Sequence, residues 1–84
     1  MSDVVREIRI DECLWQNSMV QAGVLSEWAV GDGAIVEAGQ GVATIVIEDA
    51  ALTVRAAAGG RLTQVARVNA VLEPGDIIGR IVET

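Results

Sequence analysis

The sequence has 84 residues and a formal net charge of −6 at pH 7, and about half of its residues are apolar. This length and composition suit one small domain, residues 1–84, with an aliphatic core. All six basic residues are arginines spread along the chain. They argue against nucleic acid or an anionic membrane as a partner, because both need clustered positive charge. Histidine is absent and Cys13 is the only cysteine, which argues against a disulfide framework, a zinc site and a histidine general base.

The N-terminal stretch MSDVVREIRI alternates charged and apolar residues and predicts a first strand. It lacks the long apolar run of a signal peptide or a membrane span, so we expect a cytoplasmic protein. The next stretch, ECLWQNSMVQAG (12–23), has no helical stripe and predicts a loop that packs Trp15 against the core. Cys13 lies in this loop beside Leu14. Since the sequence holds no His or Lys to activate its thiol, we expect a buried structural thiol.

The most informative feature is an internal repeat. The segment GVLSEWAVGDGAIVEAGQGVATIV (23–46) aligns with GRLTQVARVNAVLEPGDIIGRIV (60–82) after deletion of one residue in a turn. Each half reads as strand, turn, short strand, turn and strand, and both contain turn sequences, Gly-Asp-Gly at 31–33 and Glu-Pro-Gly-Asp at 73–76. We interpret the halves as a duplicated unit. The alignment pairs Gly23 with Gly60, Leu25 with Leu62, Ser26 with Thr63, Ala29 with Ala66, Glu37 with Glu73, Gly39 with Gly75 and Ile45 with Ile81.

Apolar runs of period two, bounded by turn residues, predict eight short strands. Two units that each have one apolar face can bury those faces against each other. The sequence therefore predicts an all-β, flattened sandwich of two four-stranded sheets with pseudo-two-fold symmetry. Residues 47–59 join the repeats and contribute a crossing strand and a hairpin with EDAA at its tip. The predicted strands cover residues 4–10, 24–30, 34–36, 42–47, 52–56, 61–66, 71–72 and 77–82.

Three stretches of the sequence resemble a known family. GVLSEWAVGDGAIVEAGQGVATI, AAAGGRL and VLEPGDIIGRIV are similar to the first half-motif, the small-residue stretch and the ending of biotinyl/lipoyl carrier domains. The resemblance covers residues 4–82, and Glu27 and Trp28 followed by a Gly-Asp turn are closer to the lipoyl branch. It implies a barrel-sandwich hybrid, the flattened β-barrel of this family, and a carrier protein of a 2-oxoacid dehydrogenase complex or a biotin-dependent enzyme.

The family carries its lipoyl or biotin group on one lysine at the tip of the central hairpin, and this sequence contains no lysine. Counting forward from Ile45 and back from Gly60 places that lysine at Asp49, whereas the local D-x-A context places it at Ala50. A carboxylate or a methyl group cannot form the linking amide, and arginine does not substitute for lysine. We therefore expect no attached cofactor and no cofactor-binding residue.

The hairpin tip carries two adjacent acids, Glu48 and Asp49. We interpret them as a solvated turn, with partner binding by Glu48, Asp49 and Ala50 as the alternative. No pocket is implied around them, so we predict no catalytic residue and no enzyme. Six acidic residues are candidate calcium ligands, but their spacing matches no calcium loop, so we predict no metal site. These acids are Asp32, Glu37, Glu48, Asp49, Glu73 and Asp76.

Two other motifs have structural interpretations. Gly31-Asp32-Gly33 is followed by neither the helix nor the lysine of a phosphate-binding loop, so it predicts a hairpin turn. Trp28 is expected in the core, or half-buried at a sheet edge.

The sequence leaves three functions open. The first is a non-catalytic carrier-like domain without the modifiable lysine. It would dock on subunits of a 2-oxoacid dehydrogenase or acyltransferase system, or on a lipoyl or biotin ligase. The second is a genuine group carrier of such a complex that uses another attachment residue, for instance Cys13, or whose working form differs at the tip. The third is a structural β module of a larger assembly. The sequence does not specify the partner or the oligomeric state.

Overall fold

Eight strands make up the fold in the computed structural model, which describes residues 4–11, 15 and 22–83. Each predicted strand is present, with bounds within two residues of those expected. The loop predicted for residues 12–23 falls mostly outside the described residues, and Cys13 lies there. The strands are β1 (Val4–Arg9), β2 (Gly23–Trp28), β3 (Ile35–Val36), β4 (Gly41–Ile47), β5 (Ala50–Arg55), β6 (Gly60–Gln64), β7 (Val71–Leu72) and β8 (Ile77–Glu83).

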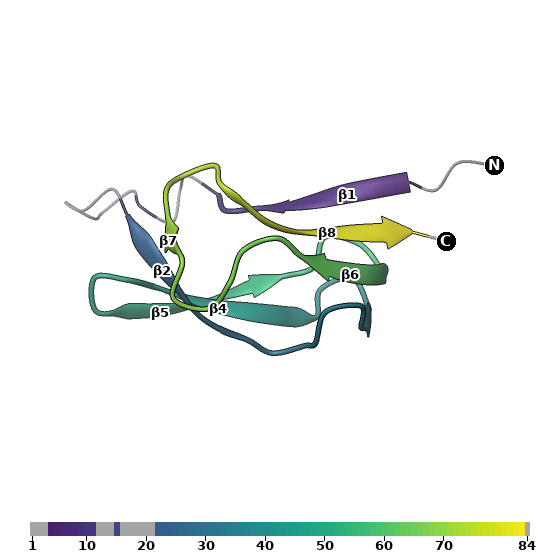
Figure 1. The fold of residues 1–84 in the computed structure, drawn as a ribbon, viewed down its shortest axis with the longest axis horizontal. Coiled ribbons are helices and arrows are strands. Elements are labelled where there is room, and N and C mark those ends of the chain that lie inside the picture. Colours follow the sequence, from purple (N-terminus) through teal and green to yellow (C-terminus); the bar gives the residue numbers. More distant parts are fainter. Residues whose placement is uncertain (1–3, 12–14, 16–21, 84) are drawn as a thin grey trace.

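The strands form two four-stranded antiparallel sheets that face each other (Figure 1). Sheet A has the order β1-β8-β6-β3, and sheet B has the order β5-β4-β2-β7. Exchanging β2 with β6, β3 with β7, β4 with β8 and β5 with β1 converts the order of sheet B into that of sheet A. The predicted all-β sandwich with pseudo-two-fold symmetry is therefore confirmed, and β5 and β1 belong to the repeated units as their fourth strands.

Hydrogen bonds outside the strands repeat with the same symmetry. The Gly39 N–H donates to the Ala56 carbonyl at 2.8 Å, and the Gly75 N–H donates to the Ile10 carbonyl at 2.9 Å. Arginine side chains follow the same rule, since Arg55 donates to the Gly39 carbonyl at 3.0 Å and its counterpart Arg9 to the Gly75 carbonyl at 3.1 Å. Equivalent sequence positions thus make equivalent contacts, as expected of a duplicated unit.

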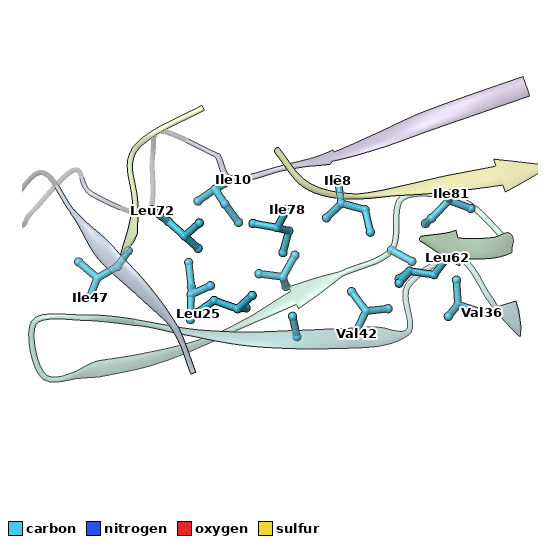
Figure 2. Close-up of a cluster of buried hydrophobic side chains, with 14 of the residues drawn as sticks. Ile8, Ile10, Leu25, Val36, Val42, Ile47, Leu62, Leu72, Ile78 and Ile81 are labelled. Carbon is cyan, nitrogen blue, oxygen red and sulfur yellow. The ribbon is translucent and has the colours of Figure 1, made fainter. Parts of the chain in front are cut away.

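The core lies between the two sheets and contains mainly aliphatic side chains (Figure 2). Strand residues alternate between this core and the outside, as the period of two requires. The strands β4 and β8, which are the longest at seven residues each, have the most buried residues. Corresponding residues occupy corresponding core positions. The buried pairs are Leu25 and Leu62, Val36 and Leu72, Val42 and Ile78, Ile45 and Ile81, Val54 and Ile8, and Ala56 and Ile10.

Both tryptophans pack against this core. Trp15 is buried, as predicted for the loop before β2. Trp28 is half-buried at the end of β2, and its Nε1–H donates to the Ala66 carbonyl at 3.0 Å. This bond crosses from sheet B to the segment that follows β6 in sheet A, so Trp28 holds the two sheets together.

The turn at 31–33 is present, but the prediction of a hairpin there was wrong. The strands on either side of it, β2 and β3, lie in different sheets and do not pair. The turn instead carries the chain from sheet B to sheet A. Asp32 fixes it, because its Oδ1 accepts the Gln64 N–H at 2.9 Å. Asn69 takes the place of Gly33 in the second repeat, and both have positive φ, at 75° and 85°.

Gly60, the first residue of β6, is required by close backbone packing. A Cβ atom there would collide with the Val82 carbonyl oxygen on β8, and its φ of 153° disfavours any side chain. We expect Gly60→Ala to lower the free energy of unfolding by more than about 1 kcal/mol, measured by urea denaturation. Gly31→Ala is the control, since a Cβ there meets nothing within 4 Å. Equal stability of the two variants would contradict the close approach of β6 and β8.

Candidate functional site

The hairpin between β4 and β5 ends in a turn of two residues. Ile47 pairs with Ala50, which leaves Glu48 and Asp49 as the turn itself. Glu48 has a positive φ of 54°, so the backbone reverses sharply at the first turn position. Glu48, Asp49 and Ala50 are all exposed. The predicted tip residues are therefore brought together at one turn, with Ala50 as the first residue of β5.

Buried side chains of β4 and β5 anchor this turn in the core. Ile45 and Ile47 of β4 point into the core and are buried, and Leu52 opposite Ile45 packs against the same cluster. The run IVI has the β-branched residues that favour a strand, and its alternation decides which residues face inward. The turn is thus anchored by apolar burial within two residues of its tip.

The hairpin turn projects at one end of an elongated molecule of 45 × 20 × 19 Å. The start of β1 and the end of β8 lie together at the opposite end (Figure 1). This placement follows from the symmetry, because the β8–β1 pair is the counterpart of the β4–β5 pair. The Ile47–Ala50 pair, which the hairpin turn connects, corresponds to the Glu83–Val4 pair, whose two strands are not connected by a turn.

The chemistry available at the turn is limited to two carboxylates and a methyl group. A lipoyl or biotinyl amide, which the sequence resemblance implies, requires the ε-amine of a lysine. Neither the turn nor any other position of the sequence supplies one. The residues present do not fit such a group, so no step of a carrier reaction can be derived at this turn.

Other polar side chains of the described segments act mainly in local structure. The Asp76 carboxylate accepts the Glu73 N–H at 2.8 Å, and the Gln40 side chain accepts the Glu37 N–H at 2.9 Å. Within the described ranges, no three acidic, cysteine or histidine side chains gather into a group that could hold a metal ion. A hollow of about 210 Å³ lies away from the turn, where Arg9 and Asp11 meet the end of β5.

No helix in the described part of the chain has the length and apolar character needed to cross a membrane.

Comparison with known proteins gives one family. The model of the biotin/lipoyl family, described as "Biotin-requiring enzyme", matches residues 16–81. This range includes the first repeat, the hairpin turn with Glu48 and Asp49, and all but the last residue of the second repeat. No curated protein matches the chain. The match agrees with the eight-stranded double-sheet fold and with the resemblance seen in the sequence.

Proposed function

The chain belongs to the biotinyl/lipoyl domain family, and we propose that it works without an attached lipoyl or biotinyl group, by docking on protein partners. Domains of this family are carriers and are not themselves catalytic. Under this proposal the present domain is likewise no enzyme and has no cofactor. Counting along the chain assigns the position of the family's lysine to Asp49, with Ala50 as the alternative from the D-x-A context.

The observation that carries the proposal is an intact hairpin that lacks the attachment residue. The two-residue turn is anchored in the core and exposed at the end of the molecule opposite the start of β1 (Figure 1). This geometry suits presentation of a turn to another protein. Because the sequence contains no lysine, presentation of an amide-linked group is replaced by presentation of the protein surface itself.

The fold and the family favour partners from the machinery that recognises carrier domains. We propose subunits of a 2-oxoacid dehydrogenase or acyltransferase system, or a lipoyl or biotin ligase, as the partners. The exposed acids Glu48 and Asp49 would meet basic groups on such a partner. Charged groups of this kind act mainly on the rate of association and on its salt dependence.

Binding of the purified, unmodified protein to purified subunits of these systems tests the proposal. We expect saturable binding that weakens with added salt. The double variant Glu48→Gln/Asp49→Asn should associate more slowly. Glu37→Gln is the control, because Glu37 is an exposed acid that is remote from the hairpin turn. Its neighbour in sequence, Val36, lies at the end of the core opposite Ile47 (Figure 2).

Two results would contradict the proposal. One is the absence of binding to every subunit tested. The other is a loss of association rate in Glu37→Gln that is half or more of the loss in the tip variant. Because the tip variant removes two charges and Glu37→Gln removes one, this ratio would indicate a general effect of net charge.

A further inference from the structure

An apolar row crosses the outer face of sheet B next to the hairpin turn. Val71 pairs with Val24, Val24 pairs with Val46, and Val46 pairs with Ala51, so the four side chains follow one line over β7, β2, β4 and β5. Leu25 follows Val24 on β2 and Ile45 precedes Val46 on β4, and both are buried in the core. Because side chains alternate along a strand, the side chains of the row point to the outer face of the sheet. Three strand spacings make the row about 14 Å long.

The row is accessible, and it is continuous rather than scattered. Val71 is 69% exposed and Val24 is 38% exposed, while Ala51 is exposed and Val46 is half-buried. Single apolar residues on a surface are ordinary, whereas apolar residues gathered into a contiguous patch are a feature of interaction surfaces. Each of four neighbouring strands contributes one residue, so the row belongs to the sheet and not to a loop.

The second repeat provides an internal comparison. The equivalent row on sheet A runs over Ile35, Arg61, Val82 and Val5. Arg61 stands where sheet B has Val24, so the row on sheet A is interrupted by a positive charge. Because both repeats build the same fold, the fold does not require valine at position 24. The uninterrupted apolar row therefore needs a reason other than folding.

The surroundings of the row are acidic. Glu27 pairs with Thr44 in the next outward row of sheet B, Asp49 lies in the hairpin turn, and Glu73 follows β7. The only basic residue in the strands of sheet B is Arg55, which pairs with Gly41 at the end away from the turn. Arg67 precedes β7 in a segment that is bonded to β2, because the Asn69 N–H donates to the Leu25 carbonyl at 2.7 Å. The three acids therefore outnumber the one basic residue beside the row. These acids form a rim beside the apolar row. A row with an acidic rim complements a partner surface whose apolar side chains are bordered by positive charge.

We propose that the row Val71–Val24–Val46–Ala51 is a docking surface for a partner protein that presents apolar side chains bordered by Lys or Arg. The inference rests on the proposed docking function and names the surface and the partner chemistry. The small size of the row fits a transient complex, whose formation is accelerated by opposite charge. A second copy of the chain is a poor occupant, because it carries the same acidic rim.

The test uses the ¹⁵N-labelled protein and a designed helical peptide with leucines on one face and arginines beside them. We expect amide shifts at residues of the row, reduced by salt, and none when glutamates replace the arginines. Val71→Ser should weaken binding about tenfold, since contact with a valine side chain is lost. Ile35→Ser is a matched control without effect, because Ile35 is the counterpart of Val71 and is 70% exposed.

A second variant, Val24→Arg, should abolish peptide binding. Its folding is expected to be preserved, since the other repeat already has Arg61 at this position, and dispersed amide spectra would verify this. The proposal is overturned by equal weakening in Val71→Ser and Ile35→Ser, by equal binding of the glutamate peptide, or by shifts over both sheets. Shifts of the row that depend on protein concentration alone would assign it to self-association instead.

The same variants separate this inference from the proposed function. If dehydrogenase or acyltransferase subunits bind and Val71→Ser leaves their affinity unchanged, the surface is wrong and the docking function stands. If no subunit binds although the arginine peptide does, the docking function is wrong and the surface stands.

Discussion

Replacement of Ile81 by alanine is expected to lower the free energy of unfolding by about 2–5 kcal/mol, and replacement of Ile45 by a similar amount. Both side chains are fully buried, and they are equivalent positions of the two repeats. Each pairs with an equivalent leucine, Ile45 lying opposite Leu25 and Ile81 opposite Leu62 across neighbouring strands. Such losses are a large part of the stability of a small domain. Urea denaturation followed by circular dichroism measures them.

Val5→Ala is the control for these core variants. Val5 lies on β1 and is 53% exposed, so its truncation should change stability by less than about 0.5 kcal/mol. If Ile45→Ala or Ile81→Ala cost as little as Val5→Ala, the alignment of the repeats across the core would be wrong.

Asp49→Lys is expected to convert the protein from a form that lipoyl ligase leaves bare into one that it modifies. Asp49 lies in a two-residue turn closed by the Ile47–Ala50 pair, and its surroundings are exposed. The substitution supplies the missing amine on an existing hairpin. Intact-mass spectrometry after co-expression with lipoyl ligase detects the added group, and biotin ligase in parallel tells the two branches of the family apart.

Ala50→Lys is the matched control, because it places the same amine one residue later, on strand β5. We expect Ala50→Lys to remain bare. Modification of Ala50→Lys instead of Asp49→Lys would move the attachment position to the site that the D-x-A context indicates. Failure of both variants to be modified would mean that the ligase does not accept this hairpin.

The sequence predicts the fold well because its pattern is simple and repeated. Turn residues divide the chain into short β-branched runs, and the aligned glycines and isoleucines place each run within its unit. The bounds of β5 were less accurate, since the predicted strand starts at residue 52 and the observed one at Ala50. Alanine has a low β propensity, but Ala50 and Ala51 pair with β4 up to the turn.

Features that depend on three-dimensional register were not predicted. The hairpin assigned to residues 31–33 fails because local turn chemistry does not reveal which sheet the next strand joins. The equivalence of Asn69 and Gly33 was also missed, although asparagine is one of the few residues that adopt positive φ readily. The apolar row can be recognised only when the pairing of four strands is known. Its one signal in the sequence is valine at outward positions such as 24 and 71, where alternation predicts polar residues.

The position of the tip residues was predicted more closely than their role. The apolar run before Glu48 and Asp49 and the strand-like run after them predict a hairpin tip, and the structure has both residues in the turn. Their function cannot be derived from the same pattern, because an exposed acidic turn serves solubility and partner binding equally well. The absence of lysine is visible in the sequence, but its consequence depends on what the protein meets in the cell.

The intact mass of the protein purified from the cells that make it tests the central claim most directly. A carrier-like domain that works unmodified should have the mass of the bare polypeptide, also when the cells are supplied with lipoate and biotin and their ligases are active. A mass increased by a lipoyl, biotinyl or acyl group would contradict this account and would identify a genuine carrier, with peptide mapping to locate the attachment residue.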